Sequence, residues 1–458
     1  MNQAEQRQEE TYHQLTEAPV GGLICRLAVP CIISMLVTAF YNLADTFFVG
    51  MLNSNSATGA VGVAFSLMAV IQAIGFFFGH GTGNYVSREL GRQDTDSAAE
   101  MASTGFFMAL AAGSAVLLLG QLFLTPLVRL LGSTETILPY AKSYVRIILI
   151  GAPWMTASLM LNNLLRFQGS AVYGMVGITA GAILNIGLDP LLIFHFGLGI
   201  SGAAIATIVS QLVSFLLLLV GCFRGGNLHI RISLLRPTRQ NLVQIVRGGL
   251  PSLARQGLAS IGMIVLNHSA GIYGDAAIAA MTIANRAMQT ANSVLIGFGQ
   301  GFQPVCGFNY GARLWNRVRE GFWFCVKFST GFLVLLSAAG FCLAPGVVAL
   351  FRNDPQVISY GTLALRLQCL SFPLSGWVVA SNMTLQTIGR TGPATFLAMA
   401  RQGVFLVPAL LLLTPVLEFL GVQAAQPVAD VLTFLVAVPI QLYILKELKA
   451  GPPPAEEK

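Results

Sequence analysis

The sequence predicts an all-α membrane protein that crosses the bilayer many times. Of its 458 residues, 55% are hydrophobic and only 10% are charged, whereas soluble domains carry about 25% charged residues. Apolar stretches of 18 or more residues recur from end to end, and a helix needs about 20 such residues to cross a bilayer. Short alternating segments, typical of membrane β-barrels, do not recur. We therefore expect a polytopic helical protein without a separate soluble domain.

Twelve stretches are predicted to span the membrane. In chain order they are 25–50, 58–84, 98–123, 137–164, 171–195, 201–222, 247–272, 277–304, 320–345, 357–384, 393–416 and 424–445. The polar, acidic N-terminal segment lacks the pattern of a cleaved signal peptide. The seven cysteines lie in or near apolar stretches and form no CxxC pair, so we interpret them as apolar packing residues.

Arginine and lysine predict the orientation of these spans. They gather at one set of span ends, which includes the longest polar stretch, 223–246, whereas the opposite ends carry only Arg129, Lys142 and Arg352. Because cytoplasmic loops carry an excess of positive residues, both termini are predicted to be cytoplasmic, in a plasma-membrane protein. The net charge of +7 arises mostly from these loops and does not indicate a nucleic-acid partner.

The two halves of the chain resemble each other. A shift of 220 places Gly81 on Gly301 and Gly91 on Gly311, and a shift of 221 places Pro30 on Pro251. Six spans per half start both halves on the same side of the membrane, so the repeat is parallel. We predict an N-lobe at 1–222, a cytoplasmic linker at 223–246, a C-lobe at 247–445 and a cytoplasmic tail at 446–458, with the two lobes facing one another across a cleft.

Two carboxylates lie within predicted spans of the first lobe. They are Asp45 in FYNLADTFFVG and Asp189 in ILNIGLDPLLIF. The matching positions in the second lobe hold Leu266 and Ala409, so the acids belong to one lobe only. A charge in hydrocarbon costs roughly 2.5 kcal/mol or more, and such residues usually mark an ion or proton pathway.

Polar neighbours complete a candidate ion-coupling site. Asn185 lies four residues before Asp189 and so shares its helix face, and Thr207 adds a hydroxyl from the next span. Oxygen ligands of this kind suit Na⁺. Alternatively, two carboxylates close together repel each other, so that one carries a proton. H⁺ and Na⁺ are both retained as coupling ions, and a buried pair that serves only helix packing is the structural alternative.

Other residues within the spans are candidates for the substrate cleft or for hinges. The predicted cleft residues are Asn42, Asn162, Asn163, Met288, Asn292, Arg255, Arg286 and Asn382. Hydrogen bonding between packed helices is the alternative for the asparagines. Asp430 either lines the cleft or makes an internal hydrogen bond, and Arg401 lies near enough to a span end to reach the interface. Pro30 and Pro190 each remove a backbone donor and are predicted hinge positions.

Four stretches carry a resemblance to a known family. They are PxxxxMLxxxxYNLADTFFVG (30–50), NIGLDP (185–190), GLPSLARQG (249–257) and IGFGQGFQPVCGFNYGA (296–312). Over residues 20–447 the chain resembles the multidrug and toxic compound extrusion (MATE) family, in its DinF-like branch and similar to the MepA-type bacterial exporters. The resemblance implies a V-shaped two-lobe fold and cation-coupled export of amphipathic, often cationic, drugs. It also implies coupling through Asp45 and Asp189, assisted by Asn185 and Thr207.

Two other classes of function are weighed against an exporter. A lipid-linked sugar flippase needs basic residues that converge on a phosphate, and Arg255, Arg286 and Arg401 keep that class of function open. The same three arginines also leave open a substrate that is neutral or anionic. A membrane enzyme needs an acidic cluster for Mg²⁺, for which only Asp94 and Asp96 are available. We expect no enzymatic activity, no cofactor beyond the coupling ion, and a monomer whose partners are a small-molecule substrate and the lipid bilayer.

Overall fold

The computed structural model describes residues 3–51, 55–224 and 228–451, and over these ranges every regular element is a helix. The first half contains α1 (Gln3–Glu17), α2 (Val20–Gly50), α3 (Asn55–Gly91), α4 (Thr95–Leu122), α5 (Leu124–Leu130), α6 (Leu138–Phe167), α7 (Ala171–Pro190), the π-helix η1 (Leu191–His195) and α8 (Gly199–Arg224). The second half contains the 3₁₀ turn η2 (Ile232–Leu234), α9 (Arg239–Gly271), α10 (Asp275–Gly311), α11 (Trp315–Phe351), α12 (Pro355–Ser371), the 3₁₀ turn η3 (Phe372–Leu374), α13 (Ser375–Thr387), α14 (Thr391–Met399), the π-helix η4 (Ala400–Val404), α15 (Leu406–Leu417) and α16 (Phe419–Ala450).

All twelve predicted spans coincide with long helices or with helices that continue directly into one another. Ten helical segments of the described chain are long and apolar enough to cross a membrane. The remaining two predicted spans are α9 and α10, which are 33 and 37 residues long but more polar. Both helices pack against the opposite half of the chain, α9 against α3 and α10 against α2, where a helix need not be apolar on every face.

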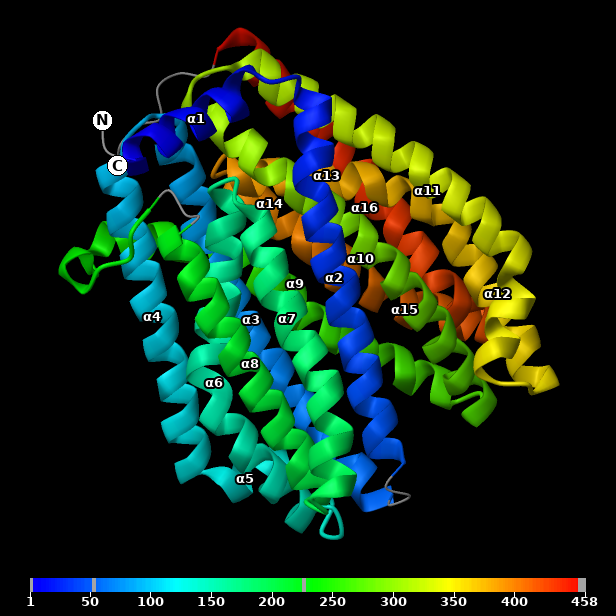
Figure 1. The fold of residues 1–458 in the computed structure, drawn as a ribbon. Coiled ribbons are helices and arrows are strands. Elements are labelled where there is room, and N and C mark those ends of the chain that lie inside the picture. The colour runs from blue at the N-terminus through cyan, green and yellow to red at the C-terminus, as the bar shows by residue number, and fades with distance from the viewer. Residues whose placement is uncertain (1–2, 52–54, 225–227, 452–458) are drawn as a thin grey trace.

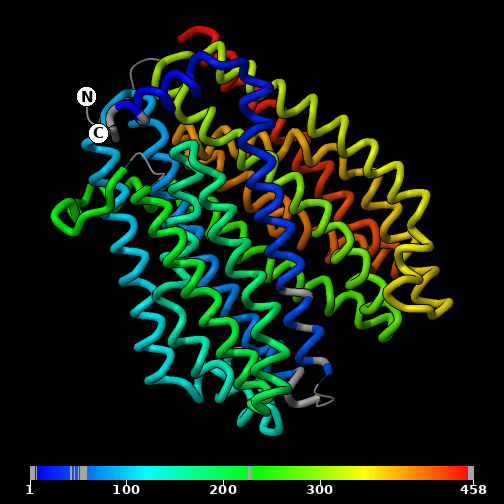
Figure 2. Tube along the Cα trace, in the orientation of Figure 1, coloured from blue at the N-terminus to red at the C-terminus, as the bar shows by residue number. Residues whose placement is uncertain are grey.

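The helices form two bundles arranged as a V (Figure 1). We call α2–α8 the first bundle and α9–α16 the second bundle. Figure 2 follows the chain from one bundle into the other and shows that the bundles converge at the end where α1 and the last turns of α16 lie. We call this end the vertex; toward the opposite end the bundles diverge. The contacts across the vertex are made mainly by α2 with α10 and by α3 with α9.

The buried apolar side chains follow the same arrangement. One cluster joins residues of both bundles at the vertex, among them Ala28, Val86, Phe302 and Phe308. A second cluster contains residues of the first bundle alone, and a third contains residues of the second bundle alone. Each bundle therefore has a core of its own toward the diverging end, and the two share a core only at the vertex.

Glycines allow the bundles to approach closely at the vertex. A Cβ added to Gly81 would lie 2.3 Å from the backbone oxygen of Ile245 in α9, and one added to Gly301 would lie 2.5 Å from Cα of Ala28 in α2. Backbone at these distances leaves no room for a side chain. These are the two glycines that the shift of 220 pairs, so equivalent helices of the repeat make equivalent contacts with the opposite bundle.

Hydrogen bonds also cross the vertex. Thr387 Oγ1 donates to Asn84 Oδ1 at 3.1 Å, and Arg88 Nη1 donates to the carbonyl oxygen of Thr387 at 2.6 Å. The N-terminal helix α1, which the sequence did not predict, packs here as well, since Asn309 Nδ2 of α10 donates to the carbonyl oxygen of Leu15 at 2.9 Å. The vertex is thus held by polar contacts in addition to apolar packing.

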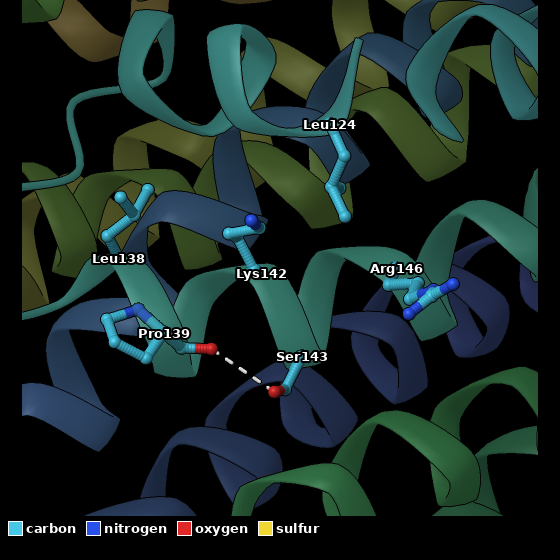
Figure 3. Close-up of a pocket in the computed structure, with 6 residues that line it drawn as sticks. All are labelled: Leu124, Leu138, Pro139, Lys142, Ser143 and Arg146. Carbon is cyan, nitrogen blue, oxygen red and sulfur yellow. Dashed lines mark hydrogen bonds between the residues drawn. The ribbon is translucent and has the colours of Figure 1, made fainter. Parts of the chain in front are cut away.

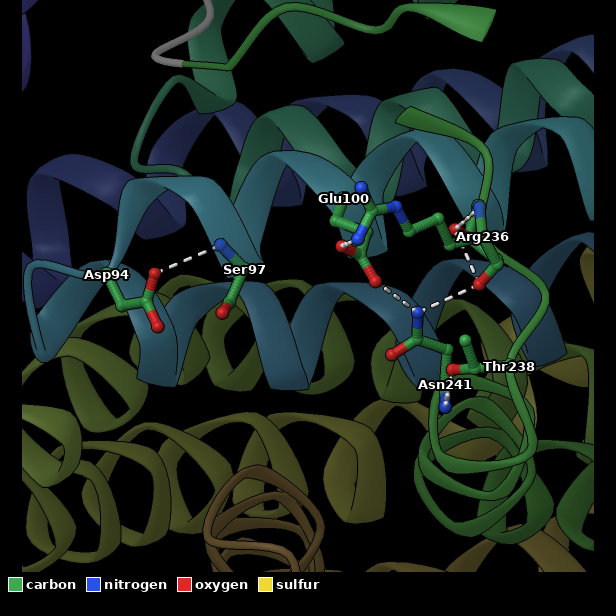
Figure 4. A network of polar contacts seen from close by, with 7 residues as sticks. Asp94, Ser97, Glu100, Arg236, Thr238 and Asn241 are labelled. Carbon is green, nitrogen blue, oxygen red and sulfur yellow. Dashed lines mark hydrogen bonds and ion pairs between the residues drawn. The ribbon is translucent and has the colours of Figure 1, made fainter. Parts of the chain in front are cut away.

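The segment that connects the two bundles, around Arg236 and Asn241, is hydrogen-bonded to α4 (Figure 4). Asn241 Nδ2, in the first turns of α9, donates to Glu100 Oε1 at 2.9 Å and to the carbonyl oxygen of Arg236 at 2.9 Å. Asp94, considered above as part of an acidic cluster, caps the N-terminus of α4 by accepting a hydrogen bond from the backbone N–H of Ser97. The division of the chain into lobes at 223–246 remains a prediction.

Candidate functional site

The two predicted carboxylates lie deep in the first bundle. Asp45 of α2 is 3% exposed, and Asp189, in the last turn of α7, is completely buried. They are close enough to interact electrostatically, because α2 packs directly against α7. Residues 144 positions apart in the sequence are thereby brought into one buried polar site.

Several oxygen atoms of this site have no hydrogen-bond partner among the described residues. They are Asp45 Oδ1, Asp189 Oδ2 and Asn185 Oδ1. Asn185 Nδ2 donates to Asp189 Oδ1 at 3.4 Å, a long contact that holds the amide beside the carboxylate. Thr207 Oγ1 donates to the carbonyl oxygen of Ala203 at 3.0 Å, so its lone pairs remain available.

The site contains polar residues that the sequence analysis did not identify. Tyr41 of α2 interacts electrostatically with both acids and through its side chain with Gln211 of α8. Tyr144 of α6 interacts with both acids and with Thr207. Tyr41 stands four residues before Asp45 and could have been found from that spacing. Tyr144 and Gln211 carry no such local signal, because only the packing of α6 and α8 against α2 brings them close.

The donor set fits a small hard cation or a proton. The unpartnered atoms are carboxylate and amide oxygens, the ligands that hard cations prefer, and the described surroundings place no lysine or arginine against the two acids. Burying two carboxylates without a counter-charge, each with one oxygen unpartnered, is costly. A bound monovalent cation, or a proton on one acid, removes that cost.

The helix around Asp189 is irregular. α7 ends at Pro190, which has no backbone N–H, and the next five residues continue as the π-helix η1. π-Helical segments are rare and often occur at functional sites. Pro30 lies inside α2, where the backbone helix is continuous and Ser34 Oγ donates to the carbonyl oxygen of Pro30 at 2.9 Å. Both prolines thus lie in helices that carry one of the two acids.

The buried carboxylate of the second bundle is fully partnered. Asp430, 4% exposed, forms an ion pair with Arg401 of η4 at 2.8 Å and accepts hydrogen bonds from Ser371 Oγ at 3.0 Å and Gln426 Nε2 at 2.9 Å. The internal hydrogen bond considered for Asp430 is therefore present. Arg401 points to this acid, which lies within the bundle, rather than to the membrane interface.

The asparagines predicted for the cleft lie in several places. Asn382 Nδ2 donates to the carbonyl oxygen of Ala394 at 2.7 Å and so joins α13 to α14. Asn162, its counterpart in the repeat, lies against Gly174 of α7. Asn292 has a buried Oδ1 without a partner among the described residues. The side chain of Asn42 lies outside the described residues.

The other cleft candidates fall into three groups. Met288 packs among the apolar residues of the second bundle. Arg286 is exposed on α10, next to exposed Gln289 and Thr290, and this polar face in the middle of a long helix is expected to meet water between the bundles. Asn163 and Arg255 lie together at the vertex. The structure therefore does not bring the eight predicted cleft residues into one pocket.

A groove on the outer surface of the first bundle does not belong to this site (Figure 3). It is lined by Leu124 of α5 and by Leu138, Pro139, Lys142, Ser143 and Arg146 of α6. Ser143 and Arg146 are exposed, whereas Tyr144 between them is buried toward the acids. The groove and the acids thus lie on opposite faces of α6.

Comparison with known proteins agrees with the internal repeat. A family model described as MatE matches the chain twice, over residues 30–191 and 251–411. The two matches are offset by 220 to 221 residues, as the repeat predicts. They place Asp45 and Asp189 in the first match and leave the linker outside both.

The chain is similar along almost its whole length to curated and solved proteins. The multidrug export protein MepA of Staphylococcus saprophyticus is 27% identical over 445 residues, which is 96% of this chain and 97% of that protein. MepA of Staphylococcus aureus is 26% identical over 440 residues, with the same coverage. An outward-facing conformation of a multidrug resistance MATE family transporter of the MOP superfamily has a TM-score of 0.89 and 27% identity, and the match covers 95% of this chain and 98% of that chain. A MATE crystal structure in the straight conformation has a TM-score of 0.90 at the same identity and coverage. Because the family model matches both halves of the repeat and more than half of the chain, this protein belongs to the MatE family.

Proposed function

We propose that this protein is a cation-coupled antiporter that exports amphipathic compounds, cationic drugs among them, from the cell. The observation that carries the proposal is the pair of buried acids, Asp45 and Asp189, each with one oxygen that lacks a partner among the described residues. The relatives named multidrug export protein support export of drugs as the direction and class of transport. The coupling ion is H⁺ or Na⁺.

The proposed coupling runs through α2. This helix contributes Asp45 to the acid site, and its N-terminal half packs against α10 of the second bundle at the vertex. Binding of a cation between Asp45 and Asp189 removes their repulsion and changes how α2 sits against α7. Pro30 lies within the vertex contact, since Ala28 and Ile32 on either side of it both approach α10, and its missing backbone hydrogen bond makes α2 easiest to bend there. The cation drives the change only by its different affinity for the two arrangements.

We propose that the vertex faces the cytoplasm and that the diverging ends face outward. Positively charged residues gather at the vertex end, among them Arg88, Arg313, Arg317 and Arg390, and positive residues favour the cytoplasmic side. Both termini are then cytoplasmic. We further propose that the two lobes exchange access by rocking about the vertex, and that a monomer is sufficient because the acid site and the vertex lie within one chain.

Transport by purified protein in liposomes tests the proposal. A fluorescent amphipathic cation is loaded, and a Na⁺ gradient or a proton gradient is imposed separately on wild type, Asp45→Asn and Asp189→Asn. The expected result is transport driven by at least one gradient in the wild type and reduced to the level of protein-free liposomes in both variants. Each substitution keeps the side-chain size and removes the charge.

Asp430→Asn is the matched control because it removes the buried carboxylate of the second bundle. We expect this variant to lose thermal stability but to keep its dependence on the imposed gradient. Gradient-driven transport that survives both first-bundle substitutions, or that is lost only in Asp430→Asn, would contradict the proposed coupling site.

A further inference from the structure

A buried arginine without a carboxylate partner lies at the vertex. Arg166, at the end of α6, is only 4% exposed. It interacts electrostatically with Cys31 of α2 and with Arg255 of α9, and its Nη2 lies 3.3 Å from His80 Nε2 of α3. Four helices, three from the first bundle and one from the second, therefore meet around its guanidinium group.

The acceptors that Arg166 does have are neutral. His80 Nδ1 lies 3.1 Å from the carbonyl oxygen of Phe76, which can only accept, so Nδ1 carries the proton and Nε2 accepts. Arg166 Nη2 donates to this nitrogen and to Asn163 Oδ1 at 2.7 Å. Neither partner bears a negative charge, so these hydrogen bonds position the guanidinium group but do not neutralise it.

The remaining donors of Arg166 are unused. Its Nε and Nη1 are buried and have no hydrogen-bond partner among the described residues. The ring of Phe167 lies 4.7 Å from its Cζ and supplies a weak cation–π contact. The half-buried Arg255 adds a second positive charge, and among the described residues no carboxylate interacts electrostatically with Arg166, Arg255 or His80. A buried positive charge next to a half-buried one, with no anion between them, is costly.

We propose that Arg166, positioned by His80 and Asn163, and Arg255 form a binding site for one compact oxyanion, a phosphate or carboxylate group, at the vertex between the two bundles. The guanidinium group of Arg166 keeps Nε–H and Nη1–H free, and each can donate a charge-assisted hydrogen bond to an oxygen of such a group. Arg255 approaches from the other bundle and supplies the second charge. An anion held by both arginines joins α6 to α9 and so stabilises the closed vertex.

This site differs from the acid site in charge, position and ligand. The acids lie between α2 and α7 inside one bundle, whereas the arginines lie where the bundles meet. The anion has two sources, a free inorganic anion or the acidic headgroup of an amphipathic compound. Binding of an amphipathic compound rests on the proposed export function, whereas binding of a free inorganic anion does not.

Thermal unfolding of the purified full-length protein in a neutral detergent tests the site. The melting temperature is followed by tryptophan fluorescence at constant ionic strength while inorganic phosphate is added, and separately while dodecyl phosphate is added. We expect a saturable rise for the wild type, because a ligand that binds only the folded state stabilises it. In Arg166→Gln and in Arg255→Gln the half-saturating concentration should rise about tenfold or more, the loss expected for a hydrogen bond to a charged group.

Arg366→Gln is the matched control. Arg366 donates from Nε to the carbonyl oxygen of Phe341 at 3.1 Å and is not part of the vertex site, so its removal should leave the rise unchanged. A rise with both phosphates supports a site that free anions fill, and a rise with dodecyl phosphate alone supports an amphipathic ligand.

The absence of a rise with both phosphates, or an equal rise in Arg166→Gln and Arg255→Gln, would overturn the site. If Arg166→Gln is not recovered folded, Arg255→Gln decides, because its half-buried side chain can be shortened without opening the core. Asp189→Asn should keep the anion-dependent rise. Failure of cation coupling and failure of the anion site can therefore be told apart.

Discussion

Replacing Gly81 by alanine should push the two bundles apart at the vertex. The added Cβ would lie 2.3 Å from the carbonyl oxygen of Ile245 and 3.1 Å from its Cα, and these are backbone atoms that cannot rotate away. Ordinary van der Waals contact begins near 3.4 Å, so α9 must move by about 1 Å relative to α3. Overpacking of a closely fitted interface costs about 1–3 kcal/mol.

That cost applies only to the arrangement in which the vertex is closed. The gain in helix propensity from glycine to alanine, about 1 kcal/mol, is present in both arrangements and cancels between them. A difference of 1–3 kcal/mol changes the ratio of closed to open vertex by about 5- to 150-fold. Gly81→Ala should therefore favour the arrangement that is open at the vertex.

The distance between the bundles can be measured with pairs of spin labels. Asp96 of α4 and Asn316 of α11 are exposed positions near the vertex, one in each bundle. In a cysteine-free background, Gly81→Ala should shift the label distances toward longer values and slow transport. Gly62→Ala is the control, because a Cβ added at this position of the same helix meets nothing within 4 Å. Unchanged distances in a well-expressed Gly81→Ala protein would refute the reasoning.

Three further changes have defined outcomes. Asp430→Asn leaves the half-buried Arg401 without its counter-charge, so we expect a loss of about 3–5 kcal/mol in unfolding free energy, measured by thermal or denaturant unfolding. Thr387→Val removes the hydroxyl that donates to Asn84 of α3. It should destabilise the closed vertex by about 1–3 kcal/mol and so shift the same label distances toward longer values, as Gly81→Ala does. Asp94→Ala removes the cap of α4 and should cost about 1 kcal/mol in stability at neutral pH. The Ser97 backbone N–H lowers the pKa of Asp94, so the cap contributes fully above the ordinary carboxyl range, and the difference between wild type and variant should vanish as pH falls through the lowered pKa.

Much of the fold could be predicted from the sequence. Apolar stretches of sufficient length specify membrane helices because the bilayer offers no partner for exposed backbone groups. The repeat could be recognised in the sequence because Gly81 and Gly301 occupy equivalent close contacts that leave no room for a side chain. Asp45 and Asp189 could be recognised as candidate site residues, since a carboxylate in an apolar helix is rare without a role.

Other features depend on packing between segments that are far apart in the sequence. Asp430 and Asp189 look alike in the sequence, each an acid in an apolar span, but Asp430 faces Arg401 and Asp189 faces Asp45. Nothing near Tyr144 or Arg166 in the sequence says which helices surround them. The helix α1 was missed because its composition is polar and its burial comes from segments far away in the sequence, such as α10 and the turn at Gly169.

Composition and spacing were enough to predict a helical membrane protein with a parallel repeat and two acids in its first half. These properties can be read from one chain segment at a time. Which buried charges are paired depends instead on how distant segments pack, because a charge is neutralised by groups within a few ångströms in space. That distinction separates the structural acid of the second bundle from the two acids of the first, and it leaves the arginines at the vertex without a counter-charge.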